Sequence, residues 1–265
     1  MSKIIDDLIA NTPNTLKNKR ADDNDLEKMS NWITSLSGFH QSKGFEIEEF
    51  DKLEERLNCV LPAELKMLYN SIGGNIDELS KETVRLQKFQ LLNFEKFWIE
   101  KDVIVKDYYT EEKWFKTDIL IYATASNIKK PLYGVDLKNG WNLLFEKEWF
   151  WQKDDMPLFQ KLITLYANII IANKKNIIKT KVKGVAGIKR DNKAEKKFER
   201  TLKRLSDFEF YEHTVFYNEE LDLLGWFRAG NRPDFLVGSN SKSNLDNIIV
   251  KFDFTSAKYV KENKE

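Results

Sequence analysis

Cysteine and histidine, two residue types that often act as nucleophile and general base, are rare in this chain. Its 265 residues include one cysteine, Cys59, and two histidines, His40 and His213. A single thiol excludes an internal disulfide and any cysteine-based metal cluster, and the apolar residues that follow Cys59 indicate a small buried hydrophobic side chain. No Ser/His/Asp arrangement accompanies His40, and His213 lies in the aromatic stretch FYEHTVF, where a packed or merely exposed imidazole is expected. We therefore expect no cysteine or histidine catalysis.

Carboxylates and a lysine near the C-terminus form a second group of candidates. The stretches FEFYEHTVFY, DFLV and NIIVKFDF are rich in β-branched and aromatic residues and predict three strands. In the last of them, alternation places Lys251 and Asp253 on the face opposite to Ile248, Val250, Phe252 and Phe254. The pattern therefore predicts an acid and a lysine side by side, with Asp234 opening the preceding strand.

The segment GNRPDFLVGSNSKSNLDNIIVKFDFTSAKY resembles the restriction-endonuclease-like PD-(D/E)xK group. The resemblance implies a metal site in which Asp234 and Asp253 hold Mg²⁺ and a lysine positions or activates the attacking water. Thr255 stands where the group has that lysine, so Lys251, in reversed order, or Lys258 is the candidate to replace it. One prediction is therefore a metal-dependent nuclease in the C-terminal module.

Two other interpretations of this module stay open. A third acid carried by some members of the group would be Glu195 or Glu199 on the preceding helix. The same residues also fit a nuclease-type fold without activity, or an unrelated α/β unit whose charges are solvated. We favour a protein that is not an enzyme, with no cofactor expected unless the module is active and binds Mg²⁺.

The formal net charge of +1 conceals a basic segment between two acidic ones. Residues 1–173 carry 23 basic and 28 acidic side chains, residues 174–204 carry 13 and 3, and residues 205–265 carry 7 and 11. The corresponding net charges are −5, +10 and −4. Such a segment indicates a linker, a boundary between modules or a partner-binding strip, and nucleic acid is a possible partner of residues 174–204.

The stretch LPAELKMLYNSIGG predicts a short and sharply delimited helix. Pro62 suits its first position, and Glu64 complements the helix dipole in the first turn. Gly73 or Gly74 is expected to end the helix with a positive φ, while Glu64 and Lys66 are expected to be exposed. The buried stripe consists of Leu65, Leu68, Tyr69 and Ile72.

The region 118–146 predicts an antiparallel sheet. The runs DILIYAT, PLYGVDL and WNLLFE have strand composition, and KNG predicts a hairpin that joins the last two. Amphipathic helices are expected over residues 24–36 and 46–57, and a helix with a wide apolar face is expected from Pro157. The first 173 residues therefore predict an α+β fold of helices, sheet and closing helix.

Residues 43–173 resemble the SUKH superfamily, which includes the yeast cell-wall regulator Smi and many bacterial toxin-immunity proteins. The resemblance rests on the acidic helix EIEEFDKLEERLN followed by LPAELKMLYNSIGGN, on PLYGVDL and on MPLFQKLITLYANI. The chain departs from the family at SNIKKPLYG, where a glycine-rich turn is common. The resemblance implies an immunity-type (antitoxin) protein that recognises and neutralises a partner toxin. A scaffold with several partners is a further alternative.

Aromatic residues make up 13% of the chain and include seven tryptophans. Most are expected in the core, but Trp and Tyr are also enriched at the residues that dominate binding energy in interfaces. We expect Trp149 or Trp151, beside Asp154 and Asp155, to lie on a partner-binding rim. The acidic balance of residues 1–173 would steer a basic toxin toward that rim.

The predicted organisation has four parts. A helical extension over 1–42 precedes a SUKH-like domain over 43–173, and a basic linker over 174–192 leads to a C-terminal α/β module over 193–265. In that module a basic helix precedes the three strands, and a frayed helix ends the chain. The N-terminal residues do not resemble a secretion signal, and the apolar runs are too short to span a bilayer. A cytoplasmic protein without a membrane partner is expected.

Overall fold

The computed structural model describes Glu27, Met29, Asn31 and Ile33 and, from residue 44 on, much of the chain. The further described ranges are 44–73, 76–87, 89–108, 113–125, 130–146, 150–154, 156–181, 203–204, 213–228, 234–251 and 257–263. The chain divides into two compact units, Met1–Ile163 (unit 1) and Thr164–Glu265 (unit 2). Within the described ranges, no helix is long and apolar enough to cross a membrane.

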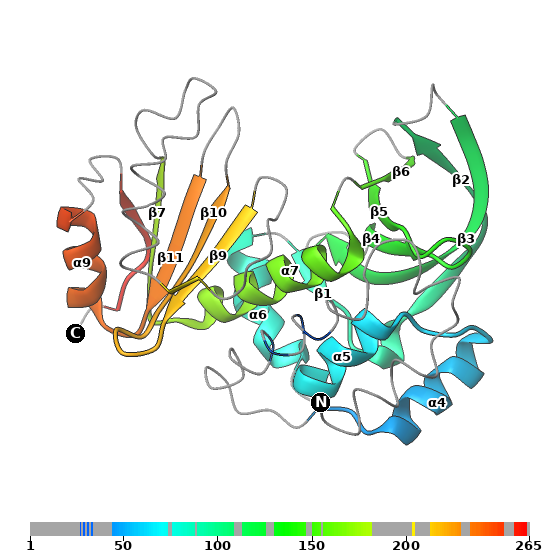
Figure 1. Cartoon of the computed structure of the whole chain (residues 1–265), viewed down its shortest axis with the longest axis horizontal. Coiled ribbons are helices and arrows are strands. Elements are labelled where there is room, and N and C mark those ends of the chain that lie inside the picture. Colours follow the sequence, from blue (N-terminus) through cyan, green and yellow to red (C-terminus); the bar gives the residue numbers. More distant parts are fainter. Residues whose placement is uncertain are drawn as a thin grey trace. The chain divides into compact units, whose positions relative to one another are not determined.

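Unit 1 combines helices with an antiparallel-rich sheet and is α+β, as predicted (Figure 1). Its helices include α4 (Ile47–Leu57), α5 (Ala63–Ile72), α6 (Ile76–Gln87) and the 3₁₀ helix η2 (Phe94–Lys96). The predicted helix over 46–57 is α4, which buries Phe50 and Leu53. Met29 and Ile33 are helical and buried, in agreement with the amphipathic helix predicted over 24–36.

Helix α5 is enclosed on more sides than its sequence indicates. Leu65, Leu68 and Ile72 are fully buried, as predicted. The prediction that Glu64 and Lys66 are exposed is wrong, since only 7% and 3% of these residues is accessible. The Lys66 ammonium lies 2.6 Å from Oε1 of Glu54, which also accepts a hydrogen bond of 2.7 Å from the backbone N–H of Leu61. Lys66 therefore forms a buried ion pair with Glu54 of α4 and does not face the solvent.

The end of α5 also differs from the prediction. Gly73 has φ −46° and ψ −54°, which is right-handed helical backbone, so the expected positive φ is absent there; Gly74 lies outside the described residues. Glycine is favoured at position 73 because a Cβ would lie 1.9 Å from Cδ2 of Phe45, so that ring would have to shift. The Phe45 ring stacks on Phe94 with the centroids 4.4 Å apart. Close packing, and not a left-handed turn, explains this glycine.

The sheet of unit 1 closes on itself. Strands β2 to β6 pair successively in antiparallel fashion, and β6 returns to β2 in parallel, so five strands form a ring. Figure 1 shows β4, β5 and β6 within the curve of β2 and β3. The predicted β4–β5 hairpin is confirmed, with Gly140 at φ 68°. The strands are β1 (Phe89–Leu91), β2 (Trp98–Asp107), β3 (Lys113–Ala125), β4 (Lys130–Asp136), β5 (Asn142–Phe145) and β6 (Trp151–Lys153).

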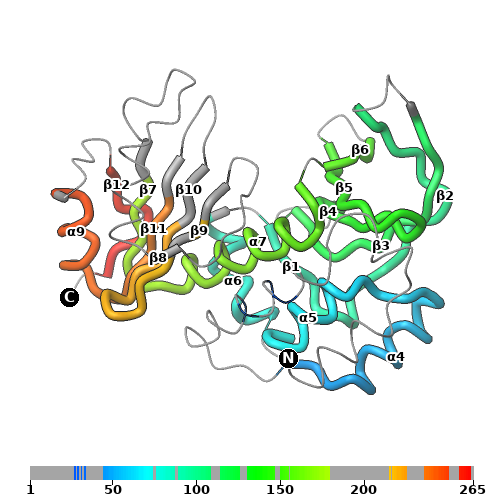
Figure 2. Tube along the Cα trace, viewed as in Figure 1, coloured from blue at the N-terminus to red at the C-terminus, as the bar shows by residue number. Residues whose placement is uncertain are grey.

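Helix α7 (Leu158–Asn173) runs across the division into unit 2 and is buried along most of its length, as its wide apolar face predicts. Unit 2 contains an antiparallel sheet in the order β12-β7-β11-β10-β9-β8 (Figure 2). Helix α9 (Lys242–Lys251) packs against β11 and β7. The strands are β7 (Asn176–Lys181), β8 (Lys203–Arg204), β9 (His213–Asn218), β10 (Leu223–Arg228), β11 (Asp234–Ser239) and β12 (Lys258–Lys261).

Three predictions for unit 2 are wrong. The predicted linker contains β7, which pairs with both β11 and β12 and buries Ile177 and Ile178. The predicted strand NIIVKFDF is helical up to Lys251, because Leu245 and Ile248 meet the sheet at helical spacing. The predicted terminal helix contains β12 instead. The lysines around β7 made that segment look like a linker, and the β-branched residues of α9 favoured a strand. In both cases the tertiary contacts that decide the structure are not visible in the local sequence.

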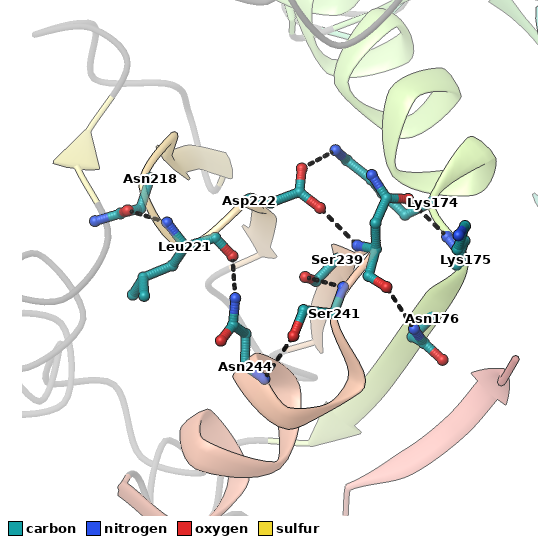
Figure 3. Close-up of polar contacts among 10 residues, drawn as sticks. Lys174, Lys175, Asn176, Asn218, Leu221, Asp222, Ser239, Ser241 and Asn244 are labelled. Carbon is teal, nitrogen blue, oxygen red and sulfur yellow. Dashed lines mark hydrogen bonds and ion pairs between the residues drawn. The ribbon is translucent and has the colours of Figure 1, made fainter. Parts of the chain in front are cut away.

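Polar contacts fix one end of the unit 2 sheet (Figure 3). Asp222, in the β9–β10 turn, pairs with the Lys174 ammonium and accepts a hydrogen bond of 2.6 Å from the backbone N–H of Asn240. The Asn176 side chain donates to the Asn240 carbonyl at 3.2 Å. Asn244, in the first turn of α9, donates to the Leu221 carbonyl at 2.7 Å. These contacts tie the start of β7 to the β9–β10 turn and to α9, and so hold the strand registers.

Candidate functional site

A β-bulge in β2 decides which side chains of that strand face outward. The register against β3 shifts between Glu100 and Val103, and Asp102 adopts φ 56° while its backbone N–H donates to Oδ1 of Asp118 at 2.8 Å. A bulge adds one residue and so reverses the alternation of the strand beyond it. As a result Val105 is buried, whereas Ile104 is 59% exposed.

Large apolar side chains collect on the outer side of β2 and β3. Tyr108 and Trp114 are each 52% exposed, and the pairing of Lys106 with Trp114 places the two strands' residues on one face. Phe150, just before β6, meets Trp114 edge to face, with the centroids 6.1 Å apart at 66°. We call this surface the aromatic face; its residues are Ile104, Lys106, Tyr108, Trp114 and Phe150.

A lysine lies at the centre of the aromatic face. The Lys106 ammonium is 4.3 Å from the ring centroid of Tyr108, 5.6 Å from that of Trp114 and 5.9 Å from that of Phe150. Contacts of this kind stabilise a cation over an aromatic ring and hold both groups in place. Lys106 therefore supplies the positive charge among the five residues that define the aromatic face.

The inner side of the same strands gives the aromatic face a packed base. Trp151 is 2% exposed and its indole N–H donates to Oε2 of Glu100 at 3.0 Å. The Lys153 ammonium lies 3.4 Å from Oδ2 of Asp107 and 3.1 Å from the ring centroid of Trp141. Because these interior groups are paired, the outer side chains stand on an ordered sheet, which lowers the entropy lost when a partner binds.

The structure describes two of the four residues predicted for the partner-binding rim. Trp151 is buried, and Asp154 has a structural role, since its Oδ2 lies 2.9 Å from both the Asn142 amide and the Lys161 ammonium. Trp149 and Asp155 lie outside the described residues. Trp114 is instead the tryptophan with the largest exposure among the described residues. Sequence reasoning missed this surface because the run VIV in β2 places apolar residues on both faces of the strand and so shows no alternation.

The predicted nuclease residues are only partly described. Asp234 opens β11, in register with Lys181 of β7 and Arg228 of β10. Lys251 ends α9, so the strand alternation that placed it beside Asp253 does not apply there; Asp253 itself lies outside the described residues. Across the described ranges, no three His, Cys, Asp or Glu side chains gather as metal ligands would.

The single thiol is not activated. Cys59 is half-buried just after α4, and burial, with a smaller contribution from Glu54, raises the pKa of its thiol to about 11. Such a thiol stays protonated at neutral pH and is a poor nucleophile.

Comparisons with family models, with curated proteins and with solved structures find no match to this chain.

Proposed function

We propose that this chain is an immunity-type binding protein that neutralises a partner protein toxin through the aromatic face of unit 1. The observation that carries the proposal is the exposed cluster of Ile104, Tyr108 and Trp114 around Lys106 on a packed sheet. The resemblance of residues 43–173 to the SUKH superfamily supports the toxin as the kind of partner. Blocking a toxin requires a complementary surface and no catalytic group.

The chemistry of the aromatic face favours a protein partner over a sugar or an unpaired base. Trp114 and Phe150 meet at 66° and so do not form a flat stacking platform. Ile104, the most exposed of the set at 59%, offers only aliphatic contact. Exposed aromatic residues of this kind, when they enter a partner's pocket, supply much of the energy of protein–protein interfaces.

The charges of this chain affect toxin binding both at long range and at contact. The net charge of −5 over residues 1–173 attracts a basic toxin from afar. Binding would bury the Lys106 ammonium, and a buried cation without an acceptor is destabilising. The toxin must therefore place a carboxylate or a backbone carbonyl against Lys106. We therefore propose a toxin that is basic as a whole but presents an acceptor to Lys106.

Co-expression with the toxin-like product of an adjacent gene tests the proposal. The full chain should copurify with that product and restore growth, and Trp114→Ala or Ile104→Ser should reduce both effects. Val60→Ser is the matched control, because Val60 is an exposed apolar residue between α4 and α5 and is not part of the aromatic face. Failure to bind or neutralise any neighbouring product contradicts the proposal, and capture of several unrelated partners would favour a scaffold.

A further inference from the structure

Strand β3 has one side without a partner strand beside the aromatic face. On its other side β3 pairs with β2 along most of its length. Away from β2, the pairing of β3 with β4 ends at Ile119, and one further bond joins the Leu137 N–H to the Asp118 carbonyl at 3.0 Å. Among the described residues, no strand pairs with this side of β3 over residues 113–117. We call this side of residues 113–117 the open edge of β3.

The backbone groups of Trp114 and Lys116 face the open edge. In an antiparallel pair, residues that bond to the partner strand alternate with residues whose N–H and C=O face away from it. The Asp118 carbonyl bonds away from β2. Because the extra residue of the bulge belongs to β2, β3 alternates regularly, and Lys116 and Trp114 therefore face away from β2 as well. Phe115 and Thr117 bond to β2 instead. The open edge thus offers one donor and one acceptor on each of two residues.

The usual devices that block an edge strand are absent or turned aside here. Proline and lysine commonly prevent another strand from pairing with an edge, and residues 113–117 include no proline. The Lys116 ammonium lies 3.0 Å from Oδ1 of Asp102 in β2. This ion pair draws the lysine side chain over β2 and away from the open edge. The bulge that exposes Ile104 therefore also keeps the edge accessible, because it presents Asp102 to Lys116.

We infer that a strand of the toxin pairs with the open edge of β3 and so extends the sheet of unit 1. The inference rests on the proposed function and adds how the toxin is held. Backbone donors and acceptors in a regular row are matched by an extended backbone, as in complexes where a peptide adds a strand to a sheet edge. A helix has no such row of free groups. Since Trp114 belongs to both surfaces, the added strand is continuous with the aromatic face.

The side chains along the open edge define the chemistry of the added strand. Successive residues of a strand point to opposite faces of the sheet, and directly opposed side chains of paired strands contact each other. Trp114 is 52% exposed on the outer face. On the inner face Phe115 is half-buried and meets Trp141 edge to face, with the centroids 5.4 Å apart. The toxin strand therefore carries apolar side chains at two successive positions, one on each face.

Binding of the purified full chain to the toxin-like product of the adjacent gene tests the inference. Lys116→Pro removes the N–H that faces the open edge and keeps the bonds between β2 and β3, since an edge strand tolerates proline at such a position. It should weaken binding roughly tenfold or more. Lys116→Ala is the matched control, because it removes the same side chain and keeps the N–H. Its affinity should stay within about threefold of the wild-type value.

Amide hydrogen exchange of the wild-type chain, resolved by NMR, gives a second measurement that requires no variant to fold. The Trp114 and Lys116 amides should exchange rapidly in the free chain and slowly in the complex, because only the complex pairs them. The Phe115 amide, which bonds to β2, should exchange slowly in both states and serves as the internal control.

The inference is overturned if the Trp114 and Lys116 amides exchange as rapidly in the complex as in the free chain, or if Lys116→Pro binds as tightly as Lys116→Ala. If Trp114→Ala still weakens binding in that case, the toxin contacts only side chains of the aromatic face and the proposed function stands. Slow exchange of both amides in the free chain, increasing with its concentration, would assign the edge to a second copy of this chain. If the gene product does not bind, the proposed function fails and the inference fails with it.

Discussion

Burial of the Glu64 carboxyl makes the stability of the chain depend on pH. Burial raises the pKa of its carboxyl from 4.5 to about 7, with a smaller opposing contribution from its own backbone N–H. Between these values the folded chain keeps a proton that the unfolded chain has lost. The free energy of unfolding therefore falls as pH rises from 4.5 through 7, and the loss is complete above that range.

Replacing this carboxyl should remove the pH dependence. Glu64→Gln keeps the shape of the side chain and cannot ionise, so its stability relative to the wild-type protein should increase by about 3 kcal/mol between pH 4.5 and pH 8 or above. Denaturant unfolding of both proteins across this range provides the measurement. A difference between the two that stays constant with pH would show that Glu64 is not buried as described.

Gly73 allows a second prediction at the residue scale. Its φ of −46° suits any residue, so Gly73→Ala should destabilise unit 1 only through the collision with Phe45, by about 1–3 kcal/mol. Thermal or denaturant unfolding measures this. In a Phe45→Ala background the same substitution should become neutral or stabilising. An equal loss in both backgrounds would mean that the backbone at position 73 is strained.

At the residue scale, the sequence predicted some burials correctly and others wrongly. Leu65, Leu68 and Ile72 were predicted to be buried because their spacing alone defines a helical face. Glu64 and Lys66 were misplaced because enclosure by α4 and the rest of unit 1 is a tertiary effect that helical spacing does not encode. The exposure of Ile104 likewise depends on the bulge between Glu100 and Val103, which regular strand alternation does not encode.

At the scale of elements, the contact between α7 and the β9–β10 turn rests on an unequal ion pair. The Lys174 side chain is 5% exposed and that of Asp222 is 32% exposed, and burial lowers the pKa of the lysine despite its partner. Asp222→Asn should therefore destabilise unit 2 by roughly 2–4 kcal/mol, because a buried ammonium loses its counter-charge.

The reverse substitution should be much milder. Lys174→Met keeps the aliphatic chain that packs on Gly238 and leaves only a carboxylate that water can solvate. Its effect should stay within about 1 kcal/mol. Urea unfolding monitored by tryptophan fluorescence compares the two variants. Equal losses from Asp222→Asn and Lys174→Met would contradict the asymmetry of burial.

Elements with local signals were predicted and elements with conflicting signals were not. The hairpin β4–β5 follows from KNG, and α7 follows from its apolar length. In contrast, NIIV favours a strand by composition yet lies in α9, where Leu245 and Ile248 contact the sheet. Strand β7 is a central strand whose lysines resemble those of a linker. Pairing partners distant in sequence decide such cases.

At the scale of the whole molecule, composition and order of elements were sufficient for the α+β class. Closure of the ring was not predictable, because it depends on the parallel pairing of β2 with β6, whose residues Val105 and Trp151 are far apart in sequence. The candidate binding surface of unit 1 has the same origin. The aromatic face collects residues from β2, from β3 and from the residue before β6, so it forms no motif along the chain.

The dissociation constant between the purified chain and its toxin tests the central claim most directly. Trp114→Ala should weaken binding by roughly 30-fold or more, as expected for a residue that contributes at least 2 kcal/mol at an interface. Because Trp114 is 52% exposed in the free protein, the melting temperature should change little, and Val60→Ser should leave the affinity unchanged. If Trp114→Ala binds the toxin as tightly as the wild-type protein does, the aromatic face is not the toxin-binding surface.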